Sequence, residues 1–326
     1  MKIAVDVTAL AQTRAGTARY LRALLPRLEG EATLQRVSGF ASGRAGTLWL
    51  DLAWYPHVLP HLAGGADVLH CPTYRGPVRR GSVPVVVTVH DVAVFRHPGA
   101  FPVWTRMYSQ RVVPRVLQAA RRIIAVSEFT AGELESVLRV PREKVRVVPN
   151  AVDAVFGPDG RRADGDYVLA VGTLEPRKNL ARVIEATRRL AVELRVVGAR
   201  GWGGVEAHGD GVTWLGEVDD KELARQYRGA LCLAYPSLYE GFGIPVLEAM
   251  ACGSPVVTSA EGATAEIAGG AAVLVDPLDT GAIAAGIEQA IAQRDELRPR
   301  GLERARAFSW DESARRTLDL YREAAA

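Results

Sequence analysis

Short apolar runs alternate with helical segments along the whole chain, and this alternation restricts the fold more than any other feature. The runs are "KIAVDV", "ADVLH", "VPVVVTVHD", "RRIIAVS" and "KVRVVP" in the first half, then "YVLAVG", "LRVVG", "VTWLG", "LCLAYPS" and "SPVVTS" in the second. Runs of this kind are typical of strands that are buried on both faces. The alternation therefore predicts an α/β protein in which helices cover both faces of parallel sheets.

The length of 326 residues suggests about two domains, each large enough to bury a core. The segment 153–166, "DAVFGPDGRRADGD", lies between the two sets of strands. It shows no hydrophobic periodicity, which indicates a linker. We therefore expect two Rossmann-like, doubly wound domains, at residues 1–155 and 166–310, facing each other across a cleft. Ligands of such sheets bind at the carboxyl ends of the strands.

The composition excludes several classes of protein. Apolar residues make up 48% of the chain and charged residues 24%, and no run approaches the roughly 20 apolar residues of a membrane span. A net charge of +3 is too small to indicate a nucleic-acid partner. The cysteines, Cys71, Cys232 and Cys252, are widely spaced, so we expect a reduced, cytoplasmic protein without disulfides or a cysteine zinc site.

Two glutamates flank a glycine-rich turn in "YEGFGIPVLEAMACGSPVVTS", residues 239–259. Pro245 suits a first helical turn and Gly253 suits the position after a helix, so we expect a helix from about residue 244 to residue 252. Glu240 then lies on the loop before the helix, and Glu248 lies one turn inside it.

The start of this helix is suited to an anion. Gly241 and Gly243 are expected to leave the backbone uncovered there, where unpaired N–H groups and the positive end of the helix dipole favour negative charge. A solvated helix with two surface glutamates is the alternative. We favour the anion site, because a purely structural turn does not need Gly-Phe-Gly.

A second strand end, in "YVLAVGTLEPRKNLARVIEA", carries two cations. A turn with Gly172 and Pro176 leads to a helix that should begin near Asn179, and Arg177 and Lys178 stand where the helix dipole would favour acids. Most basic residues of this chain are arginines, and the lysines are only Lys2, Lys144, Lys178 and Lys221. We therefore favour phosphate binding over a solvated charge pair.

Fewer candidates come from the first half. His90 and Asp91 follow the apolar strand in "VVVTVHD", and Gly16 and Thr17 fall in the first strand-to-helix loop. That loop is not a G-x-G-x-x-G fingerprint, and no G-x-S-x-G, H-E-x-x-H or Walker motif occurs. The "DGD" at residues 164–166 precedes its strand, so we interpret it as linker and predict no metal site.

With these residues in place, the chain resembles the retaining glycosyltransferases of family 4, or glycosyl transferase group 1, which share the two-domain GT-B fold. The specific part of the likeness is "EGFGIPVLEAMACGSPVV" with its two glutamates, joined to "VGTLEPRKN". Weaker matches are "VHD", "VSEFT", "VPNAVD" and the C-terminal "FSWDESARRTLDLYREA". In the family this last segment crosses back to the N-terminal domain, which implies that residues 311–326 pack there.

The resemblance also implies roles for the candidate residues. Glu240 would hold hydroxyls of the donor sugar, and Glu248 would hold the ribose hydroxyls of the nucleotide. Arg177 and Lys178 would neutralise the diphosphate as the glycosidic bond breaks. Backbone N–H groups near the helix start would face the sugar and diphosphate, and the residues concerned are Gly241, Phe242, Gly243 and Ile244.

Contacts from other loops are implied too. His90 would reach the donor sugar from the N-terminal domain, while Gly16 and Thr17, with Asp91, would lie near the phosphates or the acceptor. Gly172 and Thr173 would line the donor site. Many relatives carry Gly-Arg where this chain has Gly172-Thr173, so the extra arginine that they aim at the diphosphate is missing here.

The implied activity is transfer of a hexose from a nucleotide-diphosphate sugar to a hydroxyl of a glycan, lipid-linked glycan or small molecule, without metal or other cofactor. The leaving phosphate would take the acceptor proton, since no carboxylate is placed as a nucleophile. The alternatives are a sugar-nucleotide epimerase, a phosphorylase and a sugar-nucleotide-binding protein without catalysis. A phosphorylase would need a much longer chain with a pyridoxal lysine.

Contact with a membrane is a separate question. The segment "FPVWTRMYSQRVVPRVLQAARR" carries five arginines beside apolar residues, a combination that can bind the surface of anionic lipid. We expect Pro114 to interrupt its helix, and we favour a solvated face on a core helix over peripheral binding at the inner face of the membrane.

Overall fold

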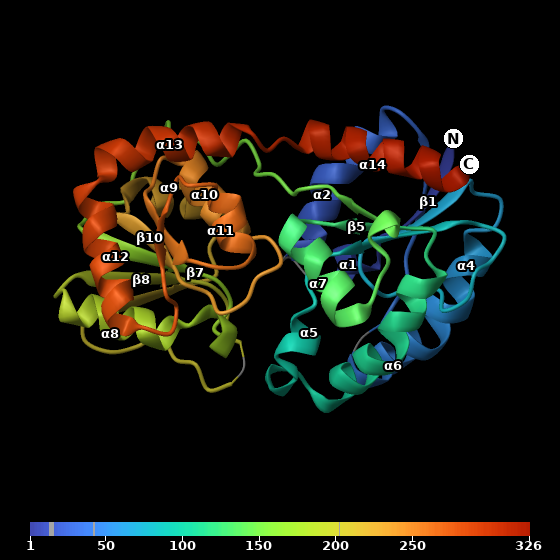
Figure 1. Cartoon of the computed structure of the whole chain (residues 1–326), viewed down its shortest axis with the longest axis horizontal. Coiled ribbons are helices and arrows are strands. Elements are labelled where there is room, and N and C mark those ends of the chain that lie inside the picture. Colours follow the sequence, from blue (N-terminus) through green and yellow to red (C-terminus); the bar gives the residue numbers. More distant parts are fainter. Residues whose placement is uncertain (13–15, 42, 202) are drawn as a thin grey trace. The chain divides into compact units, whose positions relative to one another are not determined.

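The computed structural model describes residues 1–12, 16–41, 43–201 and 203–326. They form two compact units (Figure 1). Unit 1 comprises Met1–Asn150 and Trp310–Ala326, and unit 2 comprises Ala151–Ser309. Segment 153–166, which the sequence indicated as a linker, belongs to unit 2, where Phe156 packs against the ring of Tyr227.

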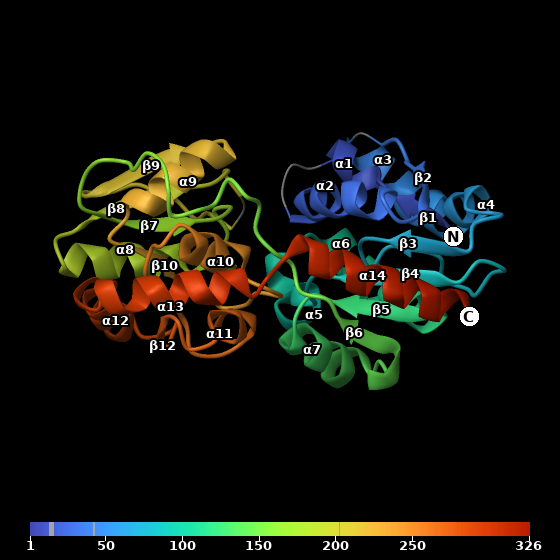
Figure 2. The same ribbon diagram turned by 90° about the horizontal axis from the view of Figure 1, so that it is seen from above.

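Unit 1 is built on a parallel sheet in the order β2-β1-β3-β4-β5-β6 (Figure 2). Its strands are β1 (Lys2–Asp6), β2 (Thr33–Val37), β3 (Val68–Cys71), β4 (Val85–Val89), β5 (Arg122–Ala125) and β6 (Val145–Val147). The helices are α1 (Thr8–Gln12), α2 (Gly16–Glu29), α3 (Gly43–Trp49), the π-helical η1 (Leu50–Val58), α4 (Leu59–Leu62), α5 (Ala93–Arg96), η2 (Pro98–Ala100), α6 (Val103–Ala119), α7 (Glu128–Leu138), η3 (Arg142–Lys144) and α14 (Trp310–Ala325).

Unit 2 has a second parallel sheet, in the order β12-β11-β10-β7-β8-β9. Its strands are β7 (Tyr167–Val171), β8 (Glu193–Val197), β9 (Val212–Gly216), β10 (Cys232–Tyr235), β11 (Val256–Ser259) and β12 (Val273–Val275). The helices are the 3₁₀ turn η4 (Pro176–Lys178), α8 (Leu180–Arg189), α9 (Asp220–Gly229), α10 (Ile244–Ala251), α11 (Ala263–Ala268), α12 (Thr280–Ala292) and α13 (Arg294–Arg306).

The expected fold class, an α/β protein with two Rossmann-like units, is confirmed. Each of the ten apolar runs contains a strand, and the sequence analysis missed only β2 and β12 among the strands of the described residues. Both lie at an edge of their sheet. β2 is interrupted by Gln35 and Arg36, so it lacks the continuous apolar run that identified the others. β12 lies in the short apolar run "AAVLV", which was overlooked.

One helix departs from the sequence analysis. Pro114 was expected to interrupt the basic helix, and this prediction is wrong, because α6 runs unbroken from Val103 to Ala119. The proline removes one backbone hydrogen bond, at a cost of roughly 3 kcal/mol. Val113, Val116 and Leu117 are all buried on either side of it, and each contributes about 1.5–3 kcal/mol. Burial of the helix outweighs its defect.

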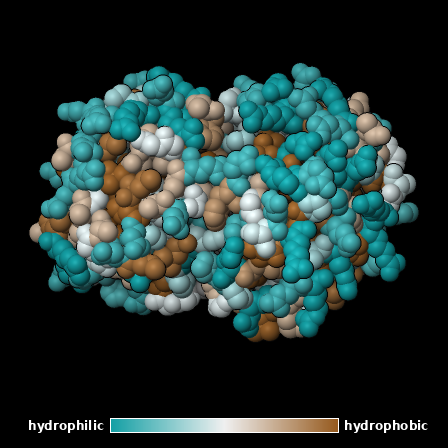
Figure 3. Space-filling view, in the orientation of Figure 1, coloured by the Kyte–Doolittle hydropathy of each residue, from teal (hydrophilic) through white to brown (hydrophobic). Residues whose placement is uncertain are grey.

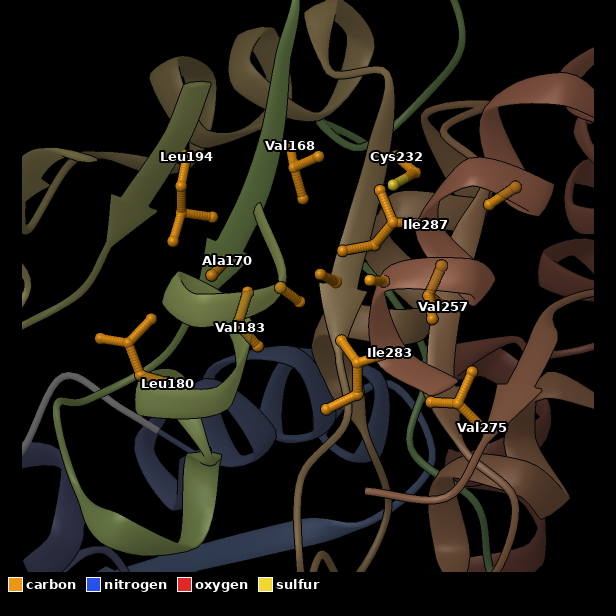
Figure 4. Packing of buried hydrophobic residues seen from close by; sticks show 14 of the residues in the cluster. Val168, Ala170, Leu180, Val183, Leu194, Cys232, Val257, Val275, Ile283 and Ile287 are labelled. Atoms are coloured by element: carbon orange, nitrogen blue, oxygen red, sulfur yellow. The ribbon is translucent and has the colours of Figure 1, made fainter. Parts of the chain in front are cut away.

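The core of unit 2 explains why the strand ends are held in place. Side chains of β7, β8 and β10 meet those of α8 and α12 in one apolar cluster, which includes Val168, Leu194, Cys232, Val183 and Ile283 (Figure 4). Close-packed protein interiors deform little, so the loops at the carboxyl ends of β7 and β10 start from fixed positions.

The C-terminal helix returns to unit 1, as the resemblance implied. α14 packs on α2 and on the strands β3, β4 and β5 (Figure 2). Ser313 donates a hydrogen bond to the carbonyl of Pro149, and the hydroxyl of Tyr321 lies 2.7 Å from Nδ1 of His70. The helix is therefore fixed to unit 1 by polar contacts as well as by its apolar face.

Candidate active site

The candidate site of unit 2 lies where the strand order reverses. The chain runs from β7 outward to β8 and β9, then returns to β10 on the other side of β7 and continues to β11 and β12. The loops after β7 and β10 therefore diverge at their carboxyl ends, and we call this place the switch point of the sheet. Gly172 follows β7 with φ 141°, and a Cβ there would lie 3.3 Å from Cε of Lys178. The glycine thus lets the lysine pass close to the backbone.

Glu240 is bound to both cations at this switch point. Its Oε1 lies 2.6 Å from Nζ of Lys178, and its Oε2 lies 2.8 Å from Nη1 of Arg177. The hydroxyls of Tyr235 and Ser237 donate to the same Oε1 at 2.8 and 2.7 Å. The structure therefore brings together three of the predicted residues, from loops about sixty residues apart in the sequence.

The charges of this cluster set the state of Glu240. Burial by itself would raise the pKa of Glu240, but the Lys178 and Arg177 charges and the hydrogen bonds outweigh burial and lower it to about 2. The buried Glu175 accepts a further hydrogen bond, at 2.6 Å, from Nη2 of Arg177. Two cations and two carboxylates thus form one charge-balanced cluster, and the phosphate that the sequence predicted for the cations remains a prediction.

The helix after the glycine-rich turn forms as expected. α10 spans Ile244–Ala251, and Gly243 precedes it with φ 105°. The expectation that the glycines leave this backbone uncovered is wrong, because residues 241–243 are buried. The ring of Phe242 packs edge-on against Phe308 at 5.9 Å, and a Cβ on Gly243 would lie 3.0 Å from Thr264. The positive φ and the close approach of Thr264 explain the glycine at position 243.

Glu248 lies one turn into α10, and its side chain is buried with 1% of the residue exposed. The phenol of Tyr227 donates to its Oε2 at 3.0 Å. Tyr227 is not among the partners of Glu240 described above. The predicted contact with ribose remains a prediction.

Unit 1 holds the other predicted residues. His90 follows β4, and its Nε2 lies 3.0 Å from the carbonyl oxygen of Pro72, which it can approach only as a donor. Burial lowers the pKa of His90, so the ring is neutral. Asp91 accepts a hydrogen bond from the backbone N–H of Ala93 at 2.9 Å, at the start of α5. Gly16 and Thr17, which we expected in a loop, are the first two residues of α2.

Comparison with known proteins decides the family. The family model for glycosyltransferase family 4 matches residues 4–156, and the model for glycosyl transferases group 1 matches residues 154–308. The O-antigen chain mannosyltransferase B of Escherichia coli is 31% identical over 289 residues, which cover 78% of this chain and 74% of that protein. The chain belongs to glycosyltransferase family 4.

Solved structures show the fold of this family 4 protein to be GT-B. The sucrose-phosphate synthase of Thermosynechococcus elongatus superposes with a TM-score of 0.78 at 20% identity, over 99% of this chain and 98% of that one. HepE of Anabaena, in complex with UDP-glucose, superposes with a TM-score of 0.72 at 17% identity, over 99% of this chain and all of that one.

The sequence analysis of this glycosyltransferase missed three residues of the cluster: Glu175, Tyr235 and Ser237. Tyr235 ends an apolar strand, and a polar tip at that position was a usable signal, because strand ends border ligand sites. Gly172, Thr173, Lys178 and Tyr235 line a small cavity of about 20 Å³ at the switch point. Within the described residues, no group of three or more His, Cys, Asp or Glu could hold a metal ion.

Proposed function

We propose that this family 4 glycosyltransferase moves a hexose from a nucleotide-diphosphate sugar to a hydroxyl acceptor and retains the anomeric configuration. The observation that carries the proposal is the contact of Lys178 and Arg177 with Glu240 at the switch point of unit 2. Cations suit the diphosphate of such a donor, and a carboxylate suits the vicinal hydroxyls of its sugar.

The hydrogen bonds indicate where the donor would bind. Oε1 of Glu240 accepts from Lys178, Tyr235 and Ser237, while Oε2 accepts from Arg177. A carboxylate has about four acceptor positions shared by its two oxygens, so a sugar hydroxyl would approach Oε2. Nζ of Lys178 donates to Tyr235 and Glu240, and its third hydrogen would serve a phosphate oxygen.

Lys178 would then act on the bond that breaks. As the bond between C1 of the sugar and the phosphate oxygen lengthens, negative charge grows on the leaving oxygen, and a fixed ammonium stabilises that charge. The acceptor oxygen would bond to C1 on the same face, and its proton would pass to the leaving phosphate. His90, neutral and in unit 1, would contact the sugar as a hydrogen-bond partner.

The names of relatives narrow the substrates. The relative from Escherichia coli is a mannosyltransferase of an O-antigen chain, and the HepE structure contains UDP-glucose. Both point to a hexosyl donor, and the first points to a glycan or a lipid-linked glycan as acceptor. GDP-mannose and UDP-glucose are therefore the donors to test first.

The test has two steps. Thermal shift with nucleotide diphosphates identifies the base, since a ligand at 100 times its dissociation constant adds about 2.7 kcal/mol of stability. The matching sugar donor is then incubated with glycan acceptors, and the anomeric configuration of the product is read by NMR. An α-linked product from an α-linked donor supports the proposal. A β-linked product overturns retention, a donor consumed without acceptor indicates an epimerase, and binding without a single turnover indicates a binding protein.

We further propose that transfer needs no divalent metal or other cofactor, because the side chains of Lys178 and Arg177 supply the cationic charge that a metal supplies elsewhere. Activity should survive extensive treatment with EDTA. Loss of activity with EDTA and its return with magnesium or manganese would overturn this part of the proposal.

The last part of the proposal is a cytoplasmic location. Peripheral contact with the inner face of the membrane is the alternative to the solvated face that the sequence favours, and the exposed side chains of α6 are the reason to test it. α6 carries several arginines and no acid, and it exposes 60% of Val103 and 44% of Met107. Its Trp104 donates at 3.0 Å to Asp51 of η1, beside the exposed Leu52. Hydrophobic patches bordered by hydrophilic residues are visible where α6 lies (Figure 3). Among the described helices, none combines the length and apolar character needed to cross a bilayer.

Co-sedimentation with liposomes tests the membrane contact. Wild type should sediment with anionic vesicles and stay in solution with neutral ones, and Arg111→Gln with Arg115→Gln should weaken the binding. The matched control neutralises Arg300 and Arg315, which are exposed on other helices. Equal loss in both double variants would show that total charge, rather than α6, is responsible.

A further inference from the structure

Tyr235 occupies a position between the two residues that matter most in the proposed function. It is the last residue of β10 and is 3% exposed. Its phenolic oxygen lies 2.7 Å from Nζ of Lys178 and 2.8 Å from Oε1 of Glu240, and these two atoms lie 2.6 Å from each other. The three side chains close a triangle of hydrogen bonds.

The direction of each hydrogen bond follows from the groups involved. An ammonium can only donate and a carboxylate can only accept, so the phenol accepts from Lys178 and donates to Glu240. Burial raises the pKa of Tyr235 well above its usual value, and the neighbouring Glu240 charge raises it further. The phenol therefore keeps the proton that it donates to Glu240.

The hydrogen bond from Lys178 to Tyr235 helps to fix the position of the ammonium. A lysine side chain has a flexible stem of four carbons, so a single ion pair leaves its ammonium able to adopt several positions. In the structure the stem of Lys178 runs along the backbone of Gly172, and its Nζ lies 5.1 Å from the centre of the Tyr235 ring. Backbone on one side and the tyrosine on the other confine the ammonium.

We propose that Tyr235 is a positioning residue, which holds the ammonium of Lys178 and the carboxylate of Glu240 at the separation that the diphosphate and the sugar of one donor require. This inference rests on the proposed function. Tyr235 itself does not touch the donor, and it acts by limiting the directions in which Lys178 and Glu240 can point. The ammonium of Lys178 stabilises developing negative charge best when its position is fixed before that charge develops.

A purely structural role is the rival explanation, and the neighbouring strand offers a matched control. Tyr167 on β7 is fully buried, as Tyr235 nearly is, and its phenol donates at 2.7 Å to the carbonyl of Gln226. It contacts neither Lys178 nor Glu240 through its phenol. Tyr167→Phe thus removes a buried phenol from the same sheet without touching the triangle.

The kinetic test is a double-mutant cycle on the full chain. Tyr235→Phe should lower kcat about tenfold while the donor KM changes little, and Tyr167→Phe should leave both near wild type. If Tyr235 acts through Lys178, then Tyr235→Phe should have almost no further effect in the Lys178→Ala background. Wild-type kcat in Tyr235→Phe, or a full tenfold loss in both backgrounds, would overturn the proposal.

A second measurement does not depend on turnover. The chain has few lysines, namely Lys2, Lys144, Lys178 and Lys221, so lysine labelled with ¹⁵N gives a readable spectrum. The Nζ signal of Lys178, identified by its loss in Lys178→Ala, should exchange its protons slowly in wild type and fast in Tyr235→Phe. Equal exchange in both would refute the positioning role, even if the enzyme used another donor. If the wild-type protein transfers no sugar to any acceptor, the proposed function is wrong, and the exchange measurement still tests the positioning role.

Discussion

The two sheets of this glycosyltransferase share an arrangement, yet the buried polar side chains at the switch point of unit 2 are charged, whereas those that hold α14 on the sheet of unit 1 are neutral. Both are parallel six-stranded sheets with one reversal of strand order, between β1 and β3 in unit 1 and between β7 and β10 in unit 2. At the edge of unit 2, two cations meet two carboxylates in the cluster of Glu175, Arg177, Lys178 and Glu240. In unit 1 the carboxyl end of β1 also carries a buried acid, Asp6, and Asp51 forms an ion pair with Arg75 at 3.4 Å. The buried hydrogen-bonded chain that reaches α14 is neutral, however.

The neutral chain joins the C-terminal helix to the sheet of unit 1. His70 on β3 lies 2.7 Å from the hydroxyl of Tyr321 on α14 and 2.8 Å from the hydroxyl of Thr88 on β4. The phenol of Tyr20 also contacts Thr88, and its ring packs edge-on against His90. Burial lowers the pKa of His70 to about 3, so the ring carries no charge at neutral pH.

The comparison separates what topology provides from what side chains provide. Topology brings loops together at a strand edge in both units. Charge that is fixed and poorly hydrated can stabilise charge that develops in a reaction, and the cluster in unit 2 supplies it. Neutral buried hydrogen bonds can hold a helix in place, and unit 1 has those. Four experiments test this contrast.

The largest effect is expected from Lys178→Ala. Loss of a preorganised donor typically costs about 2.7–4 kcal/mol of transition-state stabilisation, so kcat should fall roughly 10²- to 10³-fold. Lys178→Arg should recover part of this, because a guanidinium spreads its charge over a wide planar fork. Initial rates at saturating donor check both, with thermal melting to establish that each variant folds. Near-normal turnover in Lys178→Ala would remove the functional contrast between the units.

The next effect concerns acid and the stability of unit 2. The pKa of Glu240 falls from 4.5 to about 2 on folding, so its contribution, roughly 3 kcal/mol, is complete above pH 4.5 and is lost as the pH falls toward 2. The difference in unfolding free energy between wild type and Glu240→Gln should therefore stay constant from pH 8 to pH 5 and shrink below pH 4.5. Urea titrations at each pH measure it. A difference that grows in acid would contradict the ion-paired state of Glu240.

The sequence predicted the elements of both units better than their contacts. Continuous apolar runs marked the central strands, and Pro245 with Gly253 marked α10 to within a residue. The edge strand β2 lacks that pattern and was missed. β12 has a short apolar run and was overlooked. Pro114 misled in the opposite direction, because the burial that keeps α6 intact depends on packing that a local pattern does not contain.

The candidate site shows the same limit. Loop position and residue type were enough to choose Glu240, Arg177 and Lys178 as candidates. Their contact with one another could not be predicted, because more than sixty residues separate the two loops. Tyr235 was overlooked, since a tyrosine within an apolar run suggests core. Distances between loops at a sheet edge depend on the order of the strands, and the spacing of residues along the chain does not determine that order.

A smaller effect, confined to stability, is expected in unit 1. Tyr321→Phe deprives Nδ1 of His70 of its hydrogen-bond partner on α14, which typically costs about 1–3 kcal/mol. For a protein of this size each kcal/mol lowers the melting temperature by roughly 2–4 °C. Calorimetry should show that loss, while kcat at saturating donor stays near wild type. A tenfold loss of kcat at an unchanged melting temperature would mean that the neutral chain of unit 1 takes part in the reaction.

The smallest effect is expected from Glu248→Gln, and it separates two acids of the same unit. A contact with the ribose of the nucleotide changes little between ground state and transition state, so its loss should raise the donor KM and leave kcat nearly intact. Glutamine preserves the shape of the side chain beside Tyr227, and the loss of one charged hydrogen-bond acceptor predicts roughly a tenfold rise in KM. Steady-state kinetics with varied donor measure both constants, with Tyr227→Phe as the control for the buried hydrogen bond. If kcat collapses in Glu248→Gln while KM holds, the buried Glu248 acts on the reacting bond, and the charged edge at Glu240 is not the only part of unit 2 that does so.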